Sequence, residues 1–147
     1  MYHYFIDDLE LPLPPEKYSL RLPRQNQVLQ LADGGQMSLL RPAGLREISF
    51  ELVLPYFAES PLICEGVRVY KPIYYLDWFA RWAAAPEPRR LIIYRALPGG
   101  QEIFNTNMLV SLEEYRVLEA ADLGFDVRVS LTLREYVKRV CERYVAV

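Results

Sequence analysis

The sequence has few of the residues from which catalytic and metal sites are built. Among its 147 residues are one histidine, His3, and two cysteines, Cys64 and Cys141. A Ser-His-Asp or Cys-His site needs a histidine beside the nucleophile, and most zinc sites need several His or Cys ligands within reach. No base or helix N-terminus is implied beside Cys64, so we interpret it as a small buried hydrophobic residue. The sequence therefore predicts no enzyme activity, no metal site and no cofactor.

It also lacks an excess of charge of one sign and any long apolar run. The formal net charge is −2 with 24% charged residues, so no overall field attracts nucleic acid or anionic lipid. No apolar run approaches the roughly 18 residues of a membrane span, and the N-terminus lacks the basic and apolar regions of a signal peptide. Two cysteines in a chain of this size form no disulfide framework. We expect a soluble protein of a reducing compartment, with no membrane contact and no specific nucleic-acid contact.

Carboxylate and glycine pairs do occur, but not with the spacing that chemistry needs. Glu113 and Glu114 are adjacent in an extended segment, where neighbouring side chains point to opposite faces, so they form no acid and base pair. The glycine pairs at 34–35 and 99–100 lack the lysine and the flanking pattern of a phosphate-binding loop. Both glycine pairs are predicted to be turns.

Apolar and aromatic residues are abundant by contrast. Hydrophobic residues make up 52% of the chain and aromatic residues 13%, with 11 tyrosines. A chain of this length buries roughly 68 to 70% of its unfolded surface, which is enough for one domain with its own core over residues 1–147. Tyrosine is enriched at protein interfaces, but it also fills strands, and both interpretations stay open.

Alternating patterns predict a β-rich chain. From Glu47 to Leu54 every second residue is apolar, and residues 90–95 hold an apolar run suited to an interior strand. A strand at 18–22 is followed by a hairpin, in which residues 27–31 and 37–40 flank a turn at 32–36. The strands and one helix predict a core that contains Ile48, Phe50, Leu52, Phe79, Trp82, Leu91, Ile93, Val127, Val129 and Leu131.

That helix is predicted over about residues 73–85. Pro72 can open it and Pro86 closes it. Its apolar stripe follows i, i+3, i+4, i+7, i+8 spacing and is strongly aromatic, with Tyr75, Trp78, Phe79, Trp82 and Ala83. Packing of this stripe against the sheet is the favoured interpretation. The alternative is a partly exposed stripe that forms a groove for a peptide or glycan.

The longest feature is a hairpin over about residues 108–136. A hairpin of this length either crosses a whole sheet or projects from the domain, and we expect its polar face to offer an edge to a neighbouring subunit. A second candidate surface is a proline-rich N-terminal arm over residues 1–15, and residues 137–147 are expected to form a short helix or a linker. The predicted interaction residues are Leu11 and Leu13 on the arm and Arg128, Ser130, Thr132 and Arg134 on the hairpin.

Several segments of the chain are informative together through their order and spacing. They are PAGLREISFE at 42–51, Leu54-Pro55, Tyr75-Leu76, Trp82, PRRLI at 88–92, FNTNMLVSLEEY at 104–115, Gly124-Phe125-Asp126 and LTLREY at 131–136. No one of them is specific. As a set, which spans most of the chain, they resemble the N-terminal region of PBSX-type phage tail proteins, whose longer members carry a LysM module after this region.

The resemblance implies a structural, non-enzymatic component of a phage or phage-like contractile tail, near the junction of tail tube and baseplate hub. It implies an α+β, β-rich fold: a tail-tube-like β-sandwich or split barrel with one principal helix and a long hairpin. The implied partners are hub, tube and tape-measure proteins and further copies in a ring, first in the bacterial cytoplasm and then in the particle. The sequence contains no LysM module, so the resemblance gives no expectation of peptidoglycan binding.

Several classes of function are therefore compared. The leading hypothesis is a ring-forming structural subunit in which the hairpin and the proline-rich arm bridge neighbours, and a monomeric adaptor is its nearest variant. A peptide- or glycan-binding module would use the aromatic helix face instead. An enzyme is disfavoured because the sequence offers no convergent acid, base or nucleophile.

Overall fold

The structure is a computed structural model that describes residues 2–57 and 67–138. Cys64, Cys141 and all but the first two residues of the predicted C-terminal helix or linker lie outside the described residues. In chain order the elements are β1 (Tyr2–Ile6), β2 (Leu9–Glu10), β3 (Lys17–Arg21), β4 (Gln27–Gln30), β5 (Gln36–Leu39), β6 (Glu47–Leu54), α1 (Pro72–Ala84), β7 (Arg89–Ala96), β8 (Glu102–Leu118), the 3-10 helix η1 (Ala121–Leu123) and β9 (Val127–Glu135).

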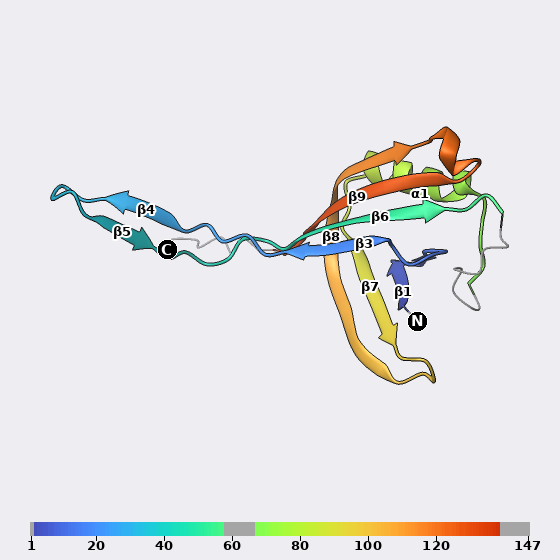
Figure 1. Ribbon diagram of the computed structural model, residues 1–147, viewed down its shortest axis with the longest axis horizontal. Helices are drawn as coiled ribbons and strands as arrows, with labels where there is room; N and C mark the ends of the chain where they lie inside the picture. Colours follow the sequence, from blue (N-terminus) through green and yellow to red (C-terminus); the bar gives the residue numbers. More distant parts are fainter. Residues whose placement is uncertain (1, 58–66, 139–147) are drawn as a thin grey trace, which may run out of the picture.

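Seven of these strands form one antiparallel sheet in the order β2-β1-β7-β8-β9-β6-β3, and β4 pairs with β5 in a separate hairpin. The sheet is folded into two parts: β1, β7 and the start of β8 run down one side, and β9, β6 and β3 run across the other (Figure 1). The edge strands β2 and β3 are not paired with each other in the described chain, so the sheet does not close into a barrel. This is the predicted β-rich α+β class with one principal helix.

β8 joins the two parts of the sheet because it is long and bent. Its first half pairs with β7 and its second half with β9, and Val110 is paired on both sides. The register with β9 shifts between Leu112 and Glu114, which places a β-bulge at Glu113. A bulge bends its strand and increases the local twist. The bend turns the inner faces of the two parts toward each other over a shared core.

The core lies between these two inner faces and beneath α1. β6 and β9 bury every second residue, because successive side chains of a strand point to opposite faces. β7, which lies between β1 and β8, is an interior strand as its apolar run predicts. The structure buries all ten side chains expected in the core, namely Ile48, Phe50, Leu52, Phe79, Trp82, Leu91, Ile93, Val127, Val129 and Leu131.

The helix α1 forms where its sequence pattern predicts, one residue earlier at each end. Pro72 stands in its first turn, where the missing N–H costs no helical hydrogen bond. Three aromatic side chains of its stripe, Tyr75, Phe79 and Trp82, are buried in the core. The structure thus favours the core interpretation over the groove. None of the described helices is long and apolar enough to cross a membrane.

The side chain of Arg95, on the interior strand β7, contacts the edge strand β3 across the folded sheet. It is 5% exposed, and its Nη1 donates to Thr106 Oγ1 at 2.8 Å. Its guanidinium carbon lies 4.2 Å from the ring centre of Phe104 and 5.9 Å from that of Tyr18, so β3 is held against β7 and β8 by cation–π contacts. Burial raises the pKa of Tyr18, and the positive charge of Arg95 acts against that rise.

The proline-rich segment does not project as an arm, which corrects one prediction. Leu11 N donates to Tyr4 O at 2.9 Å, and the side chains of Leu11 and Leu13 are buried. The segment connects edge strand β2 to edge strand β3, so its leucines turn into the core at the open side of the sheet. Burial of the two leucine side chains holds the segment against the body. Leu11 and Leu13 are therefore not surface residues in this fold.

The long C-terminal hairpin is present but does not offer a free edge, which corrects a second prediction. β9 has β8 on one side and β6 on the other along nearly its whole length. A hairpin of this length was expected either to cross the sheet or to project from the domain, and it crosses the sheet. The hairpin that projects from the body is the earlier one, β4–β5 (Figure 1).

Candidate protein interface

The most prominent surface feature is this projecting hairpin with its root, which we call the arm and define as residues 22–46. The arm extends from the ends of β3 and β6, well beyond the body (Figure 1). At its tip Gly34 has φ 87°, a conformation that residues with a side chain rarely adopt, and Gly35 N donates to Asp33 Oδ1 at 2.9 Å. None of residues 22–46 is buried.

The arm is paired from root to tip, so it is an ordered ribbon. Near the root Gly44 N donates to Pro23 O at 2.8 Å, and further out Arg41 N donates to Asn26 Oδ1 at 3.0 Å. β4 and β5 then pair in antiparallel register up to the turn. An isolated two-stranded hairpin is only marginally stable in water. The arm therefore gains stability if another surface covers it.

The two faces of the arm differ in polarity. Cross-strand partners share a face, and residues two apart on one strand share it too. One face is mainly aliphatic: it holds Leu29, Leu31, Met37 and Leu39, together with Gln27, the partner of Leu39. The other face is mixed and holds Val28, Gln30, Gln36 and Ser38. Leu29, Leu31 and Met37 are more than 40% exposed, so the described chain leaves most of the aliphatic face open to contact.

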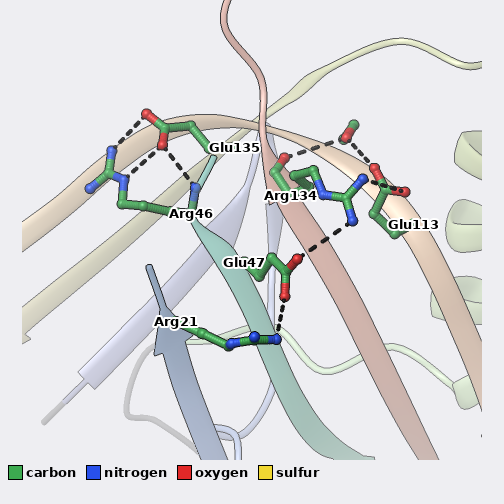
Figure 2. A network of polar contacts seen from close by, with 7 residues as sticks. Arg21, Arg46, Glu47, Glu113, Arg134 and Glu135 are labelled. Carbon is green, nitrogen blue, oxygen red and sulfur yellow. Dashed lines mark hydrogen bonds and ion pairs between the residues drawn. The ribbon is translucent and has the colours of Figure 1, made fainter. Parts of the chain in front are cut away.

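The root of the arm is fixed by charged side chains that cross four strands on the outer face of the sheet (Figure 2). Arg21 on β3 contacts Glu47 on β6 at 3.4 Å, and Glu47 contacts Arg134 on β9 at 3.6 Å. Arg134 then contacts Glu113 on β8 at 3.6 Å. The bulge in β8 thus supplies the last carboxylate of the ladder. Exposed ion pairs contribute little one at a time, so the ladder acts mainly by setting register and direction.

Arg46 and Glu135 form the strongest contact at this root. Arg46 Nε donates to Glu135 Oε2 at 3.0 Å and Nη2 to Oε1 at 3.1 Å, and the backbone N of Arg46 also donates to Oε2 (Figure 2). In return Glu135 N donates to Arg46 O at 2.8 Å. The hydrogen bonds from Arg46 lower the pKa of Glu135, and those to Glu135 raise the pKa of Arg46. The pair clamps the last residue of the arm to the end of β9.

Four polar residues on the second strand of the long hairpin were predicted to contact a partner. They lie on the outer face of the sheet, beside other residues of the same chain. Arg134 is part of the charge ladder, and Arg128 Nη2 lies 3.8 Å from Glu16 Oε1. Ser130 and Thr132 line a shallow polar hollow with two residues of β8, Glu114 and Arg116. A partner that meets this face stays a prediction. Any such contact would be made by side chains, since the backbone of β9 is already paired.

Residues that could support chemistry are dispersed. Nδ1 of His3 lies 3.0 Å from Glu10 Oε1, in a pair across β1 and β2 that involves no nucleophile. Among residues 2–57 and 67–138 there is no group of three or more His, Cys, Asp or Glu side chains arranged to hold a metal ion. The arrangement of the described residues is suited to contact with another protein.

The sequence pattern predicted the hairpin at 27–40 but not that this hairpin projects from the body. A signal was present, since one proline precedes the hairpin and another follows it, Pro23 and Pro42. Proline cannot donate to a strand ladder, so a proline on each side separates this hairpin from β3 and β6. The hairpin also alternates only weakly, with glutamine on both faces, which indicates that neither face is buried in the core.

Comparisons with known proteins give no sequence relative. No protein-family model matches the chain, and no curated protein matches it. Solved structures do match in fold. The chain is similar to a structure described as the sheath/tube terminator of the extracellular contractile injection system PVC, with a TM-score of 0.56 and 10% identity over 92% of this chain and 89% of that one.

Two further structures extend this likeness. One is the sheath-tube complex of the same system, with a TM-score of 0.56 and 11% identity over 92% of this chain and 84% of that one. The other is the tube-terminating cap of the anti-feeding prophage, with a TM-score of 0.54 and 12% identity over 91% and 83%. At such identities the likeness establishes a shared fold. The fold of this chain is therefore one that tube and terminator proteins of contractile injection systems also have.

Proposed function

We propose that this chain is a structural, non-enzymatic subunit of a phage or phage-like contractile tail, placed near the junction of tail tube and baseplate hub. One observation carries the proposal: the fold matches the PVC sheath/tube terminator over 92% of this chain, with nearly all of that chain covered in turn. The resemblance of its sequence segments to PBSX-type tail proteins supports the same role. Fold alone does not determine function, so the surface of the chain has to supply the rest.

The arm supplies a surface suited to that role. It carries an open aliphatic face on an ordered ribbon, and the Arg46–Glu135 clamp sets its direction. A subunit that contacts its neighbours through such an extension buries apolar area without rearranging its own core. In this proposal the arm takes the bridging role that sequence analysis gave to the C-terminal hairpin and to the N-terminal segment.

The proposed partners are tube, hub and tape-measure proteins and further copies of the chain in a ring. Assembly would begin in the bacterial cytoplasm and end in the particle. A ring of identical subunits needs two different, complementary faces on each subunit. The two ends of the long axis are built differently, with the β4–β5 hairpin at one end and the turn between β8 and β9 at the other, which suits such a ring (Figure 1).

Co-purification with the tube and hub proteins encoded beside this gene tests the proposal. Two variants are compared with the wild-type chain: one in which residues 23–45 are replaced by an Asn-Gly turn, and Ser38→Asp on the mixed face of the arm as a control. The wild type and the control should co-purify with at least one neighbour, and the arm-less variant should not. If the wild-type chain binds none of them, the proposed function is wrong.

A further inference from the structure

The arm is matched by a surface of opposite character at the other end of the molecule. We define this surface, the acidic pole, as residues 117–126 together with Tyr56 and Phe57. Figure 1 shows the turn between β8 and β9 at one end of the long axis and the arm at the other. The two surfaces therefore do not meet within one chain.

The acidic pole exposes apolar side chains. Phe125 is 73% exposed, Phe57 60% and Leu118 48%. The ring of Phe125 lies 5.8 Å from that of Tyr56 and 6.1 Å from that of Phe57, so the aromatic side chains form one contiguous cluster. Contiguous exposed apolar patches are uncommon on soluble monomers and mark contact sites.

The pole and the arm carry opposite charge. Residues 117–126 contain three carboxylates and no basic residue. The arm contains three arginines and one aspartate, a net charge of +2 in a chain whose total is −2. Lys71, the cation beside the aromatic cluster, is engaged there, because its Nζ lies 4.0 Å from the ring centre of Tyr56 and donates to Tyr56 O at 3.1 Å.

The charges are also placed where a partner could meet them. Glu119 and Asp122 are exposed at the pole, while Asp126 already accepts a hydrogen bond from Tyr56 N at 3.0 Å. On the arm, Arg24 and Arg41 are exposed. Opposite charge at the rim of an apolar contact steers association and fixes its register.

From this complementarity we infer that the arm of one copy docks on the acidic pole of a second copy. The aliphatic face of the arm covers the aromatic cluster, and its arginines face the carboxylates of the pole. The contact is heterologous, so each added copy leaves one free arm and one free pole, and the assembly continues as a row or closes as a ring. The inference rests on the proposed function, and it names the partner of the arm.

Complementation between two broken variants tests this docking. Leu31→Asp places a charge in the aliphatic face of the arm, and Phe125→Asp places one in the aromatic cluster of the pole. Each change should weaken self-association by about tenfold or more, since it buries an unpaired charge at the centre of the contact. Both residues are exposed, so folding should be unaffected, which thermal unfolding of each variant checks.

Sedimentation velocity measures the association state of the two variants, alone and mixed. Each variant alone should be monomeric at concentrations where the wild type associates, and the mixture should form a heterodimer and nothing larger. The Leu31→Asp chain keeps an intact acidic pole, and the Phe125→Asp chain keeps an intact arm. One contact can therefore form between the two chains, and no surface is left for a third. The controls Ser38→Asp and Ile103→Asp, which add the same charge at exposed positions outside the contact, should associate like the wild type.

Several outcomes would overturn the inference. It fails if the wild type is monomeric at every concentration, if Phe125→Asp associates normally, or if the mixed variants stay monomeric. These failures are distinct from failure of the proposed function. A wild-type chain that is monomeric alone but binds tube or hub proteins through its arm would refute docking between copies and leave the structural role intact.

Discussion

At the scale of single residues, the Arg46–Glu135 pair decides how the arm leaves the body. The pair joins the last arm residue to the end of β9 through two side-chain hydrogen bonds and two that involve backbone N–H groups. A bidentate arginine–carboxylate contact fixes orientation as well as distance. Arg46 therefore acts as a positioning residue for the arm.

The pKa of Glu135 gives this pair a testable pH dependence. Arg46 lowers that pKa below its ordinary value of 4.5, so the folded state favours the ionised carboxylate. The resulting stability is present above pH 4.5 and is lost as the pH falls through the lowered pKa. We expect Glu135→Gln to reduce the free energy of unfolding at pH 7, and the difference from the wild type to shrink below pH 4.5.

Urea unfolding between pH 7 and pH 3 measures this difference. In an Arg46→Met background the same Glu135→Gln change should have a small effect that does not vary in this way with pH. A difference between wild type and Glu135→Gln that stays constant down to pH 3 would show that the pair does not couple folding to this carboxylate.

The two tryptophans allow a second test at the residue scale. Trp82 is buried, and its Nε1 donates to Glu87 O at 2.8 Å, whereas Trp78 is half-buried. In Trp78→Phe the remaining fluorescence of Trp82 should resist quenching by iodide. In Trp82→Phe the fluorescence of Trp78 should be quenched more strongly. Strong quenching of Trp82 would instead support the alternative in which the aromatic stripe is an exposed groove that binds a peptide or glycan.

At the scale of elements, strict patterns predicted the structure well and packing decided the rest. Alternation over Glu47 to Leu54 and the spacing of Tyr75, Phe79 and Trp82 identified β6 and α1, because each element buries one face. The order of strands in a sheet depends on the packing of the whole domain, so it cannot be predicted from the pattern of one segment. The sequence therefore did not show that β6 covers the free side of β9.

The N-terminal segment shows the same limit. Its prolines favour an extended conformation, and this local preference suggested an arm. In the structure the segment joins the two edge strands, and Leu11 and Leu13 are drawn into the core. Local conformation was predictable from the sequence, but the side of the sheet that the leucines would cover was not.

Substitution of Leu11 separates these two interpretations. Leu11 is 2% exposed, so Leu11→Ala should lower the free energy of unfolding by about 2–5 kcal/mol through the cavity it leaves. Leu22→Ala at the exposed start of the arm is the matched control, and it should change stability by no more than about 0.5 kcal/mol. Denaturant titration measures both. If Leu11→Ala left stability unchanged and abolished association, Leu11 would be an interface residue after all.

At the scale of the whole molecule, a closely packed body carries an ordered extension that adds nothing to the core. Every arm residue is exposed or half-buried, while the buried side chains lie in the body. A chain whose stability and contact surface are separated in this way can change partners without refolding. The shared fold with tube and terminator proteins and the projecting arm together lead to the proposed structural role.

The most direct test of that role is electron microscopy of particles from cells in which the gene is replaced by its arm-less form, with residues 23–45 exchanged for a short turn. We predict that this variant folds and accumulates but that tails lack a completed junction of tube and baseplate, while Ser38→Asp gives normal particles. Complete, contractile particles made with the arm-less chain would show that the arm does not have the structural role proposed for it.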